Sequence, residues 1–520
     1  MSTPGSLIGL DVGTSGARAV AIDLNGHVIA AASEGYPLST PRPGWTEQDP
    51  EQWWVASQAV LNQVVSQLSD PPLGVGLTGQ MHGSVFLDAA DSVIRPALLW
   101  SDQRTANECR TITEKVGRER LIEITGNPAV TGFQAPKILW LRENEPAAYA
   151  RVRKVLLPKD YIRLRLTGES ATDASDASGT LLLDLRRRAW SDEILQALEI
   201  PRGWLPAVFE GPQVTGNITS AAAATTRLPA GLPVAAGGGD NAAAAVGNGI
   251  VREGLISSSI GTSGVVFADS ETLRIEPHGR LHAFCHAIPG RYHLMGVTLS
   301  AGGSLRWWRD ASGSGLDYEA LSALAATAPP GSEGLVFLPY LTGERTPHLD
   351  PVARGAFVGL NLRHSQAHLT RAVMEGVTYS LKDCLDLMVA LGIPVTEVRA
   401  TGGGARSPMW RQLQADVFGL PVHRTLIEEG PAFGAALLAG VASGVYSDVF
   451  EACAVIQLGH DSNAPNLELH ELYRRYHAVY RDLYSATETI MHRLAALSSE
   501  ADGLTSAGSG GDVPLPRQPR

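Results

Sequence analysis

The chain has 520 residues, of which 44% are hydrophobic and 18% are charged, and its formal net charge is -11 at pH 7. The composition excludes a disordered chain, and the length predicts two large domains or three smaller ones. The negative charge argues against nucleic acid and anionic membranes as partners, and no apolar run approaches the ~20 residues that span a bilayer.

The N-terminus shows no targeting segment. Residues Met1 to Ser6 carry no basic region, and the apolar stretch behind them is interrupted at Asp11, so we expect no signal peptide. The four cysteines of the chain are far apart and lack the CxxC or Cys/His spacing of a metal site. These features predict a protein of the reducing cytoplasm.

Three antiparallel strands are predicted at the start of the chain. Leu7–Asp11 is apolar, Gly13–Gly16 is a flexible Gly-Thr-Ser-Gly turn, and Ala17–Asp23 alternates between apolar and polar residues. Asn25-Gly26 is a dipeptide preferred in tight hairpin turns, and His27–Ala32 follows as the third strand.

The turn Gly13–Gly16 recurs as Gly261–Gly264, about half the chain further on. Either two related halves each open with such a hairpin, or the short turn has recurred by coincidence. Small residues let backbone N–H groups approach a phosphate closely, so both loops suit a triphosphate such as that of ATP. Neither loop matches the P-loop or the GxGxxG pattern. The candidate nucleotide-binding residues in them are Gly13, Thr14, Ser15, Gly261, Thr262 and Ser263.

Asp11 ends the first predicted strand, immediately before the first of these loops. A carboxylate at that place could hold Mg²⁺ and offset phosphate charge. The alternative is an aspartate that caps the turn by accepting hydrogen bonds from nearby amides.

Two polar segments follow in chain order. Gln80-Met81-His82-Gly83 comes after the predicted strand Val75–Thr78, where His82 could bond a sugar hydroxyl or could serve the structure alone. Trp100–Arg104 mixes aromatic, acidic and cationic groups, as carbohydrate sites do, although a surface ion pair explains it equally well.

The segment Gly237-Gly238-Gly239-Asp240-Asn241 places one carboxylate after three residues without side chains. Backbone, substrate and carboxylate can therefore approach one another closely, which makes Asp240 the candidate general base for a hydroxyl. From this segment alone, an Asx-type turn is an equal alternative.

Strand-like and helix-like runs alternate further along the chain, which predicts an α/β fold of mixed sheets covered by helices. For example, the strand Val395–Ala400 is followed by Gly402-Gly403-Gly404-Ala405 and the amphipathic helix Met409–Phe418. The three glycines could pack flat against a nucleoside. A domain boundary is expected after the Ala/Gly-rich stretch 235–249, and residues 498–520 are predicted to form a disordered tail.

Five of these segments, in this order, resemble the FGGY family of carbohydrate kinases. They are Leu10-Asp11-Val12-Gly13-Thr14-Ser15, Gln80-Met81-His82-Gly83, Gly238-Gly239-Asp240-Asn241-Ala242, Gly343-Glu344-Arg345-Thr346-Pro347-His348 and Gly402-Gly403-Gly404-Ala405-Arg406. A second family signature is matched in spacing from Gly355 through His368 to Glu375. The similarity extends from about Leu7 to Arg493.

The resemblance implies two ribonuclease H-like, actin-like ATPase domains around a central cleft. It implies a sugar-binding domain over residues 1–246 and an ATP-binding domain over residues 247–497. ATP and Mg²⁺ are the implied cofactors, a small sugar is the implied substrate, and a homodimer is allowed.

The family's site residues carry over onto matching positions of this sequence. Met81, His82, Asp240 and Asn241 would contact the sugar, and Asp240 would accept the proton of its hydroxyl. Asp11 would lie near the metal and the phosphates.

Within the family, four segments resemble members that phosphorylate D-xylulose rather than glycerol or ribulose. They are Gln80–Gly83, Trp100–Asp102, Asp176–Thr180 and Gly430–Ala432. A kinase for another sugar or polyol, such as ribulose, gluconate or glycerol, is the nearest alternative. One departure is Gln134, where the family usually has a small Pro, Ser or Thr. It is either tolerated drift or a change of packing near the sugar that shifts substrate preference.

Two other classes of protein share some of these features. An actin-like ATPase would need filament contacts or a peptide-binding domain, and the short C-terminal tail leaves no room for the latter. A catalytically inactive sugar sensor conflicts with the presence of both Asp11 and Asp240.

Overall fold

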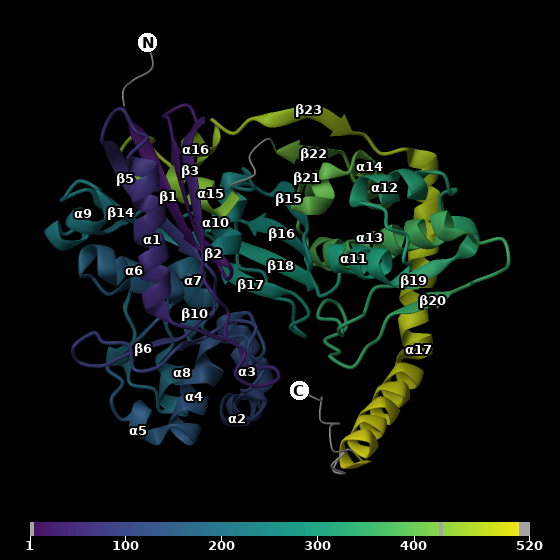
Figure 1. Ribbon diagram of the computed structural model, residues 1–520, viewed down its shortest axis with the longest axis horizontal. Helices are drawn as coiled ribbons and strands as arrows, with labels where there is room; N and C mark the ends of the chain where they lie inside the picture. Colours follow the sequence, from purple (N-terminus) through teal and green to yellow (C-terminus); the bar gives the residue numbers. More distant parts are fainter. Residues whose placement is uncertain (1–4, 426–429, 509–520) are drawn as a thin grey trace, which may run out of the picture.

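The computed structural model describes residues 5–425 and 430–508. It has two lobes, and each contains a mixed β-sheet covered by helices (Figure 1). We call them the first and the second lobe, in chain order.

The first lobe contains a six-stranded sheet in the order β13-β14-β5-β1-β2-β3. β1, β2 and β3 form the antiparallel meander that the sequence predicts, and β5 and β14 extend the sheet in parallel to β1. The strands are β1 (Ser6–Val12), β2 (Gly16–Ile22), β3 (Val28–Gly35), β5 (Pro72–Gly79), β13 (Val214–Asn217) and β14 (Pro233–Gly239).

Helix α1 illustrates how the first lobe is assembled. It begins at Pro50, because the Asp49 side chain accepts a hydrogen bond from the Glu51 backbone N–H (3.0 Å) and proline is favoured in the first turn. Its Trp53 is fully buried in the core beside β2 and β3. The helices of this lobe are α1 (Pro50–Val65), α2 (Ala106–Val116), α3 (Arg118–Thr125), α4 (Gln134–Asn144), α5 (Pro146–Tyr149), α6 (Pro158–Thr167), α7 (Ala174–Ser178), α8 (Asp192–Leu198), α9 (Ser220–Thr226) and α10 (Asp240–Gly247).

The second lobe contains a seven-stranded sheet in the order β17-β18-β16-β15-β21-β22-β23. The first four of these strands are antiparallel to one another, β21 and β22 run parallel to β15, and β23 is antiparallel to β22. The strands are β15 (Gly254–Ile260), β16 (Gly264–Ser270), β17 (His282–Cys285), β18 (Tyr292–Thr298), β21 (Val395–Thr401), β22 (Val422–Thr425) and β23 (Leu458–Asn463).

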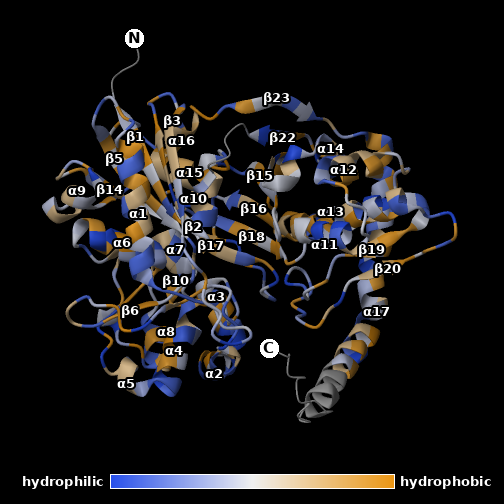
Figure 2. Cartoon of the chain, in the orientation of Figure 1, coloured by the Kyte–Doolittle hydropathy of each residue, from blue (hydrophilic) through white to orange (hydrophobic). Residues whose placement is uncertain are grey.

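Helices α11, α12, α14 and α17 pack around α13, which is buried along most of its length, whereas α15 packs on the sheet of the first lobe and α16 packs against α15. Apolar residues concentrate on the strands and on the inner helices of both lobes (Figure 2). The helices are α11 (Gly302–Ala311), α12 (Tyr318–Ala326), α13 (Gln366–Ala390), α14 (Pro408–Phe418), α15 (Gly430–Ala442), α16 (Val449–Cys453) and α17 (Leu467–Gly508). Short strands pair two by two outside the main sheets: β4 (Glu47–Gln48) with β7 (Ala97–Leu98), β6 (Val85–Leu87) with β8 (Lys154–Leu156), β9 (Ala171–Asp173) with β12 (Ala207–Phe209), β10 (Leu183–Asp184) with β11 (Ala189–Trp190), and β19 (Val336–Leu338) with β20 (Ala356–Val358).

The two sheets repeat one plan. In each, a hairpin closed by a Gly-Thr-Ser-Gly turn, β1 with β2 and β15 with β16, continues into a third antiparallel strand. A parallel strand, β5 or β21, lies on the other side of the first strand. The recurring turn therefore marks equivalent positions in two related halves, which is the ribonuclease H-like, actin-like arrangement implied by the resemblance.

Helix α15 crosses from the second half of the sequence to the sheet of the first lobe, where it packs on β1, β5 and β14. It also packs against α10. The approach to the sheet is close: a Cβ on Gly76 would lie 1.8 Å from the Ala435 carbonyl oxygen. The predicted boundary after residue 246 falls at the end of α10, but the core of the first lobe is completed by residues far beyond it.

The end of the chain differs from the predicted disordered tail. Residues 498–508 continue α17, because the run from Leu494 to Gly508 still contains mainly helix-forming Ala, Leu, Glu and Ser rather than Pro. The predicted tail residues 509–520 lie outside the described part of the chain. No helix of the described part combines the length and apolar character required to cross a membrane.

Candidate active site

Three neighbouring parallel strands of the first lobe end at one edge of the sheet and carry the predicted site residues. Asp11 on β1 lies opposite Thr78 on β5, and Gly238 on β14 lies opposite the same Thr78. Because neighbouring strands are about 4.8 Å apart, two such spacings separate Asp11 from the end of β14. The sheet therefore brings together the Asp11 loop, Gln80–Gly83 and Asp240, which lie far apart in the sequence.

A β-bulge at the end of β14 directs Asp240. The pairing of β14 with β5 slips between Ala235 and Gly238, and Gly237 has a φ of +76°. A Cβ on Gly237 would lie 1.7 Å from the Leu77 carbonyl oxygen, so this position requires glycine. Asp240 follows as the first residue of α10. Bulges beside active sites commonly re-aim a side chain in this way.

The Asp240 carboxyl is poised to change protonation near neutral pH. Burial raises its pKa to about 6, although hydrogen bonds from Asn241 oppose the rise. The backbone N–H and the Nδ2 of Asn241 donate to Oδ1 at 2.7 and 2.9 Å. No other described residue bonds this carboxyl, so Oδ2 is available to a substrate. The Asx-type bonds and the capacity to act as a base therefore coexist.

The Asp11 carboxyl lies close to Asp240. Burial and the negative charge of Asp240 raise the pKa of Asp11 to about 7, while Arg18 acts in the opposite direction. Its Oδ1 is buried, and no group in the described residues donates a hydrogen bond to it. A carboxylate that only capped the turn would not leave a buried oxygen unpaired. The position of Asp11 therefore suits a residue that could bind a cation better than one that only caps the turn.

The loop after β1 is held by its carbonyl oxygens. Tyr36 Oη donates to the Gly13 carbonyl (2.5 Å), and Gln48 Nε2 donates to the Thr14 carbonyl (2.7 Å). Gln80 Nε2 in turn donates to Gln48 Oε1 (3.1 Å), which links the end of β5 to the loop. The loop is therefore fixed before any ligand binds.

The segment Trp100–Arg104 serves two purposes. Trp100 Nε1 donates to the Thr14 hydroxyl (2.9 Å), so this half-exposed indole also holds the loop. Asp102 forms a buried ion pair with Arg104 (2.7 Å), whose guanidinium lies 3.7 Å from the centroid of the Trp45 ring. Asp102 and Arg104 do form an ion pair, but it is buried rather than on the surface as the sequence predicted.

The Met81 side chain packs against Gly239, the residue before Asp240, and His82 follows Met81 in the chain. His82 has a left-handed φ of +68°, and its ring packs on Phe133 with the centroids 4.5 Å apart. Its Nδ1 lies 2.7 Å from the Gly179 carbonyl, which can only accept a hydrogen bond. Nδ1 therefore carries the proton and Nε2 is an acceptor. Burial lowers the pKa of His82 to about 3, so the ring is neutral at physiological pH.

Two buried residues of α4 hold the backbone around His82. Gln134 Nε2 donates to the Gly83 carbonyl (2.9 Å) and the Leu156 carbonyl (3.3 Å). Lys137 Nζ donates to the His82 carbonyl (2.8 Å). Gln134, the departure from the family signature, thus touches the backbone beside the predicted sugar contact and fixes a strained turn.

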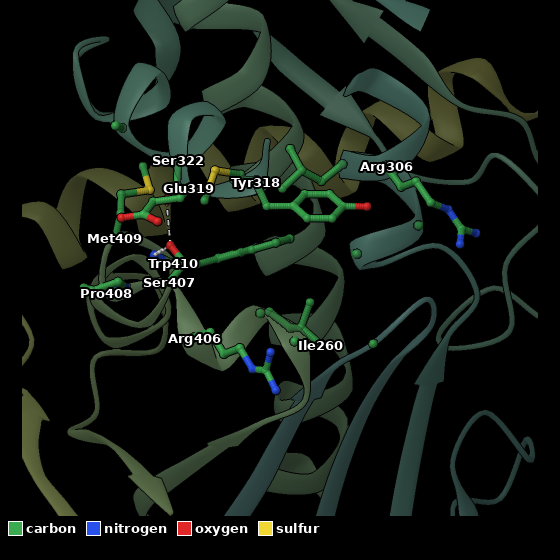
Figure 3. A pocket seen from close by; sticks show the side chains of 18 of the residues that line it. Ile260, Arg306, Tyr318, Glu319, Ser322, Arg406, Ser407, Pro408, Met409 and Trp410 are labelled. Atoms are coloured by element: carbon green, nitrogen blue, oxygen red, sulfur yellow. Dashed lines mark hydrogen bonds between the residues drawn. The ribbon is translucent and has the colours of Figure 1, made fainter. Parts of the chain in front are cut away.

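A cavity of about 920 Å³ lies in the second lobe between the β15–β16 loop, α11, α12 and the start of α14. Ile260, Tyr318 and Trp410 extend into it from three of these elements (Figure 3). The Ser407 hydroxyl caps α14: it accepts from the Trp410 backbone N–H (3.1 Å) and lies 2.6 Å from the Ser322 hydroxyl. The apolar walls and glycine-rich rim of the cavity suit a flat base with an attached sugar and phosphates.

The sequence identifies only part of this cavity. Gly261, Thr262, Gly403 and Gly404 line it, whereas Ser263, Gly402 and Ala405 are not among its lining residues. The lining residues that the sequence analysis missed come mainly from α11, α12 and α14: Gly302, Gly303, Arg306, Tyr318, Glu319, Ser322, Met409 and Trp410. The glycine pair at the start of α11, shortly after a strand, is a signal that could have identified that wall.

Known proteins resemble this chain along most of its length. The N-terminal domain of the FGGY family of carbohydrate kinases matches residues 6–247, and the C-terminal domain of that family matches residues 256–443. The xylulose kinase of Escherichia coli strain K12 is 44% identical over 486 residues, which are 93% of this chain and 99% of the relative.

Solved structures agree with this result. The crystal structure of a xylulose kinase from Brucella ovis has a TM-score of 0.88 at 40% identity, covering 93% of this chain and 100% of its own. A gluconate kinase from Lactobacillus acidophilus has a TM-score of 0.89 at 27% identity, covering 93% of this chain and 98% of its own. The fold is therefore shared by kinases named for different sugars.

Proposed function

Since the chain belongs to the FGGY family of carbohydrate kinases, we propose that it transfers the γ-phosphate of ATP to the 5-hydroxyl of D-xylulose and forms D-xylulose 5-phosphate. The observation that carries the proposal is the placement of Asp240, His82 and Asp11 at one sheet edge. The choice of sugar is supported by relatives named xylulose kinase that match over almost their whole length.

Asp240 is the proposed general base. Its Oδ2 accepts the proton of the sugar hydroxyl while the hydroxyl oxygen attacks the γ-phosphorus in line, and the bond from this phosphorus to the bridging oxygen of ADP breaks. Asn241 holds the other oxygen and thereby fixes the rotation of the carboxylate. A base within hydrogen-bond reach of the attacking oxygen has the geometry that this step needs.

His82 is the proposed contact for another hydroxyl of the sugar. Since its Nδ1 proton is committed to the Gly179 carbonyl, Nε2 can only accept, so the sugar hydroxyl must donate to it. Met81 provides an apolar wall on the same side. Gln134 and Lys137 hold the backbone of His82 and Gly83 in position. A change at either residue would therefore move His82 and alter the preference for one sugar over another.

Asp11 is the proposed ligand of Mg²⁺, either directly or through water. The unpaired, buried Oδ1 fits a hard cation, which prefers carboxylate oxygen. When bound, the ion would neutralise charge on the phosphates. The glycine-rich loops, with residues Gly13, Thr14 and Ser15 in the first and Gly261, Thr262 and Ser263 in the second, would surround those phosphates.

The cavity of the second lobe is the proposed adenosine site, with Gly402–Ala405 forming its edge. Replacement of Gly403 by leucine tests this assignment, because a Cβ there meets only the Ile260 carbonyl oxygen, at 3.9 Å, and the added side chain would occupy the cavity without disturbing the backbone. We expect KM for ATP to rise at least about tenfold, equivalent to 1.4 kcal/mol of lost binding, with sugar binding unchanged.

The matched control for this variant is Gly203→Leu, which also adds a side chain at a glycine with open space around it, but far from the cavity. Steady-state kinetics with varied ATP and calorimetric titration with D-xylulose separate the two ligands. An unchanged KM for ATP in Gly403→Leu would place the nucleotide elsewhere.

The pH dependence of kcat/KM tests the role of the two carboxyls. Asp240, with a pKa of about 6, can accept a proton only above that pH, and Asp11, with a pKa of about 7, must lose its proton to bind a cation. We expect kcat/KM to begin falling as pH drops through 7 and to fall at least tenfold per unit below about 6. A flat profile between pH 5 and 8, measured with saturating Mg²⁺, would contradict this assignment.

A substrate panel tests the proposed function itself. ADP release is measured with Mg-ATP and D-xylulose, D-ribulose, L-ribulose, glycerol, gluconate or no sugar. A preference for D-xylulose is expected. A preference for another acceptor would retain the kinase and replace the substrate, whereas equal hydrolysis without sugar would favour an actin-like ATPase.

A further inference from the structure

The bulge that directs Asp240 is held from behind by a fully buried arginine. Arg163 on α6 donates from Nη1 to the Ala235 carbonyl (2.9 Å) and from Nη2 to the Ala236 carbonyl (2.5 Å). The register slip begins at these residues, so their carbonyls cannot all be used by the regular ladder. Arg163 thereby satisfies the backbone groups released by the bulge.

A serine holds the other end of the bulge. Ser175 Oγ accepts from the backbone N–H of Gly239 (3.1 Å), the residue directly before Asp240. The same hydroxyl donates to Asp173 Oδ2, which also accepts from the Ser175 backbone N–H (2.7 Å). A chain of hydrogen bonds therefore runs from the start of α7 to the peptide that carries the base.

Both contacts are anchored in one buried cluster of five charged residues, because Arg163 is a member and Ser175 is hydrogen-bonded to another member, Asp173. We call it the α6–α7 cluster: Lys159, Asp160, Arg163, Asp173 and Asp176. Lys159 Nζ lies 2.7 Å from Asp160 Oδ1, 2.8 Å from Asp173 Oδ1 and 3.1 Å from Asp176 Oδ2. Arg163 Nε lies 3.7 Å from Asp160 Oδ1. All five side chains are completely buried.

The α6–α7 cluster combines two basic and three acidic side chains. Burial raises the pKa of Asp176 well above its usual value, the positive charge of Lys159 opposes the rise, and the negative charges of Asp173 and Asp160 add to it. Buried ion pairs stabilise a fold little more than apolar residues of similar size, because desolvation offsets their attraction. Stability alone does not account for five such residues behind the base.

We propose that the α6–α7 cluster positions the catalytic base: Arg163 and Ser175 grip the two ends of the β14 bulge and so set the direction of Asp240. This inference rests on the proposed role of Asp240. The members are positioning residues, since none of them reaches the site itself. In the low dielectric of the interior, each hydrogen bond from Arg163 and Ser175 to the bulge is stronger than it would be in water.

Replacement of Ser175 by alanine tests the proposal, because it removes the acceptor of the Gly239 N–H and leaves every charge of the α6–α7 cluster in place. We expect kcat to fall about 10- to 100-fold, as small misplacements of a reacting group do, with KM for D-xylulose within about twofold of the wild type. The acidic limb of the kcat profile should also shift, because the environment of Asp240 changes.

Thr172→Val is the matched control. Thr172 lies on β9 next to Asp173, and its buried hydroxyl has no hydrogen-bond partner in the described residues, so its loss should leave kcat and the pH profile unchanged. Asp173→Asn is the second variant, which keeps the shape but weakens the bond to Ser175, and it should reproduce the kinetic loss. If Ser175→Ala behaves like Thr172→Val, the proposal is wrong.

A double-mutant cycle separates this proposal from the proposed function. If Ser175 acts through Asp240, adding Ser175→Ala to Asp240→Asn should cause little further loss of kcat. An equal additional loss in both backgrounds would mean that Ser175 acts by another route. Full activity of Asp240→Asn alone would instead overturn the role of the base, whatever Ser175 does.

Discussion

Replacing Asp240 with asparagine is expected to lower kcat about 10³-fold, because the amide keeps the shape of the side chain and cannot accept the hydroxyl proton. KM for D-xylulose should change little, since the amide can still bond the sugar. The measurement is coupled ADP release at pH 8, where the wild-type carboxyl is fully ionised because its pKa is about 6.

Asp23→Asn is a suitable control for this variant. Asp23 accepts hydrogen bonds from the backbone N–H groups of Asn25 and His27 in a turn of the same lobe, outside the site. It should retain the wild-type kcat. Undiminished turnover in Asp240→Asn would remove this residue from the chemistry.

Replacing Asp11 with asparagine is expected to lower kcat/KM about 10²-fold and to raise the Mg²⁺ concentration needed for half-maximal activity at least tenfold. The amide retains a neutral oxygen but loses the charge that attracts the ion. Mg²⁺ titrations at fixed ATP measure the shift. Titration of the nucleotide-free protein with Mn²⁺, followed by its electron paramagnetic resonance, reports metal affinity independently of turnover.

The same replacement should stabilise the fold at high pH. The pKa of Asp11 in the folded protein, about 7, is above its unfolded value of 3.8, so stability is fully present below the unfolded pKa and is lost as pH rises through the folded one. Asp11→Asn should therefore raise Tm at pH 8 by a few degrees and leave it unchanged at pH 4. An unchanged Mg²⁺ requirement, or a lower Tm at pH 8, would contradict the assignment of Asp11 as a buried, unpaired metal ligand.

Local sequence patterns predicted the elements that local chemistry determines. The meander from Leu7 to Ala32 follows from alternation and an Asn-Gly turn, and the order of β21, Gly402–Ala405 and α14 follows from a strand, glycines and an amphipathic run. The candidate site residues Asp11, His82 and Asp240 come from the same kind of local pattern, because each lies at or shortly after the end of a strand that is apolar or glycine-rich.

The remaining features depend on contacts between distant segments, which no local pattern encodes. The proton position on His82 depends on a carbonyl nearly a hundred residues later, and the bulge at Gly237 depends on Arg163 and Ser175. The walls of the second-lobe cavity come from three separate helices. The Gly and Ser content of residues 498–520 predicts disorder, whereas α17 extends through residues 498–508 as a continuation of the helix that precedes them.

The packing of α15 on the sheet of the first lobe bears on the order in which the protein can be made. During synthesis, β1, β5 and β14 leave the ribosome long before the helix that covers one of their faces, so that face stays uncovered until the chain has been extended past Ala442. The first lobe therefore cannot finish folding as an independent domain before the second half of the chain has been synthesised. An N-terminal fragment that stops at α10 would expose the apolar, glycine-lined face of the sheet that α15 normally covers. Such a fragment would need a chaperone, or a peptide of residues 430–442 added separately, to remain in solution.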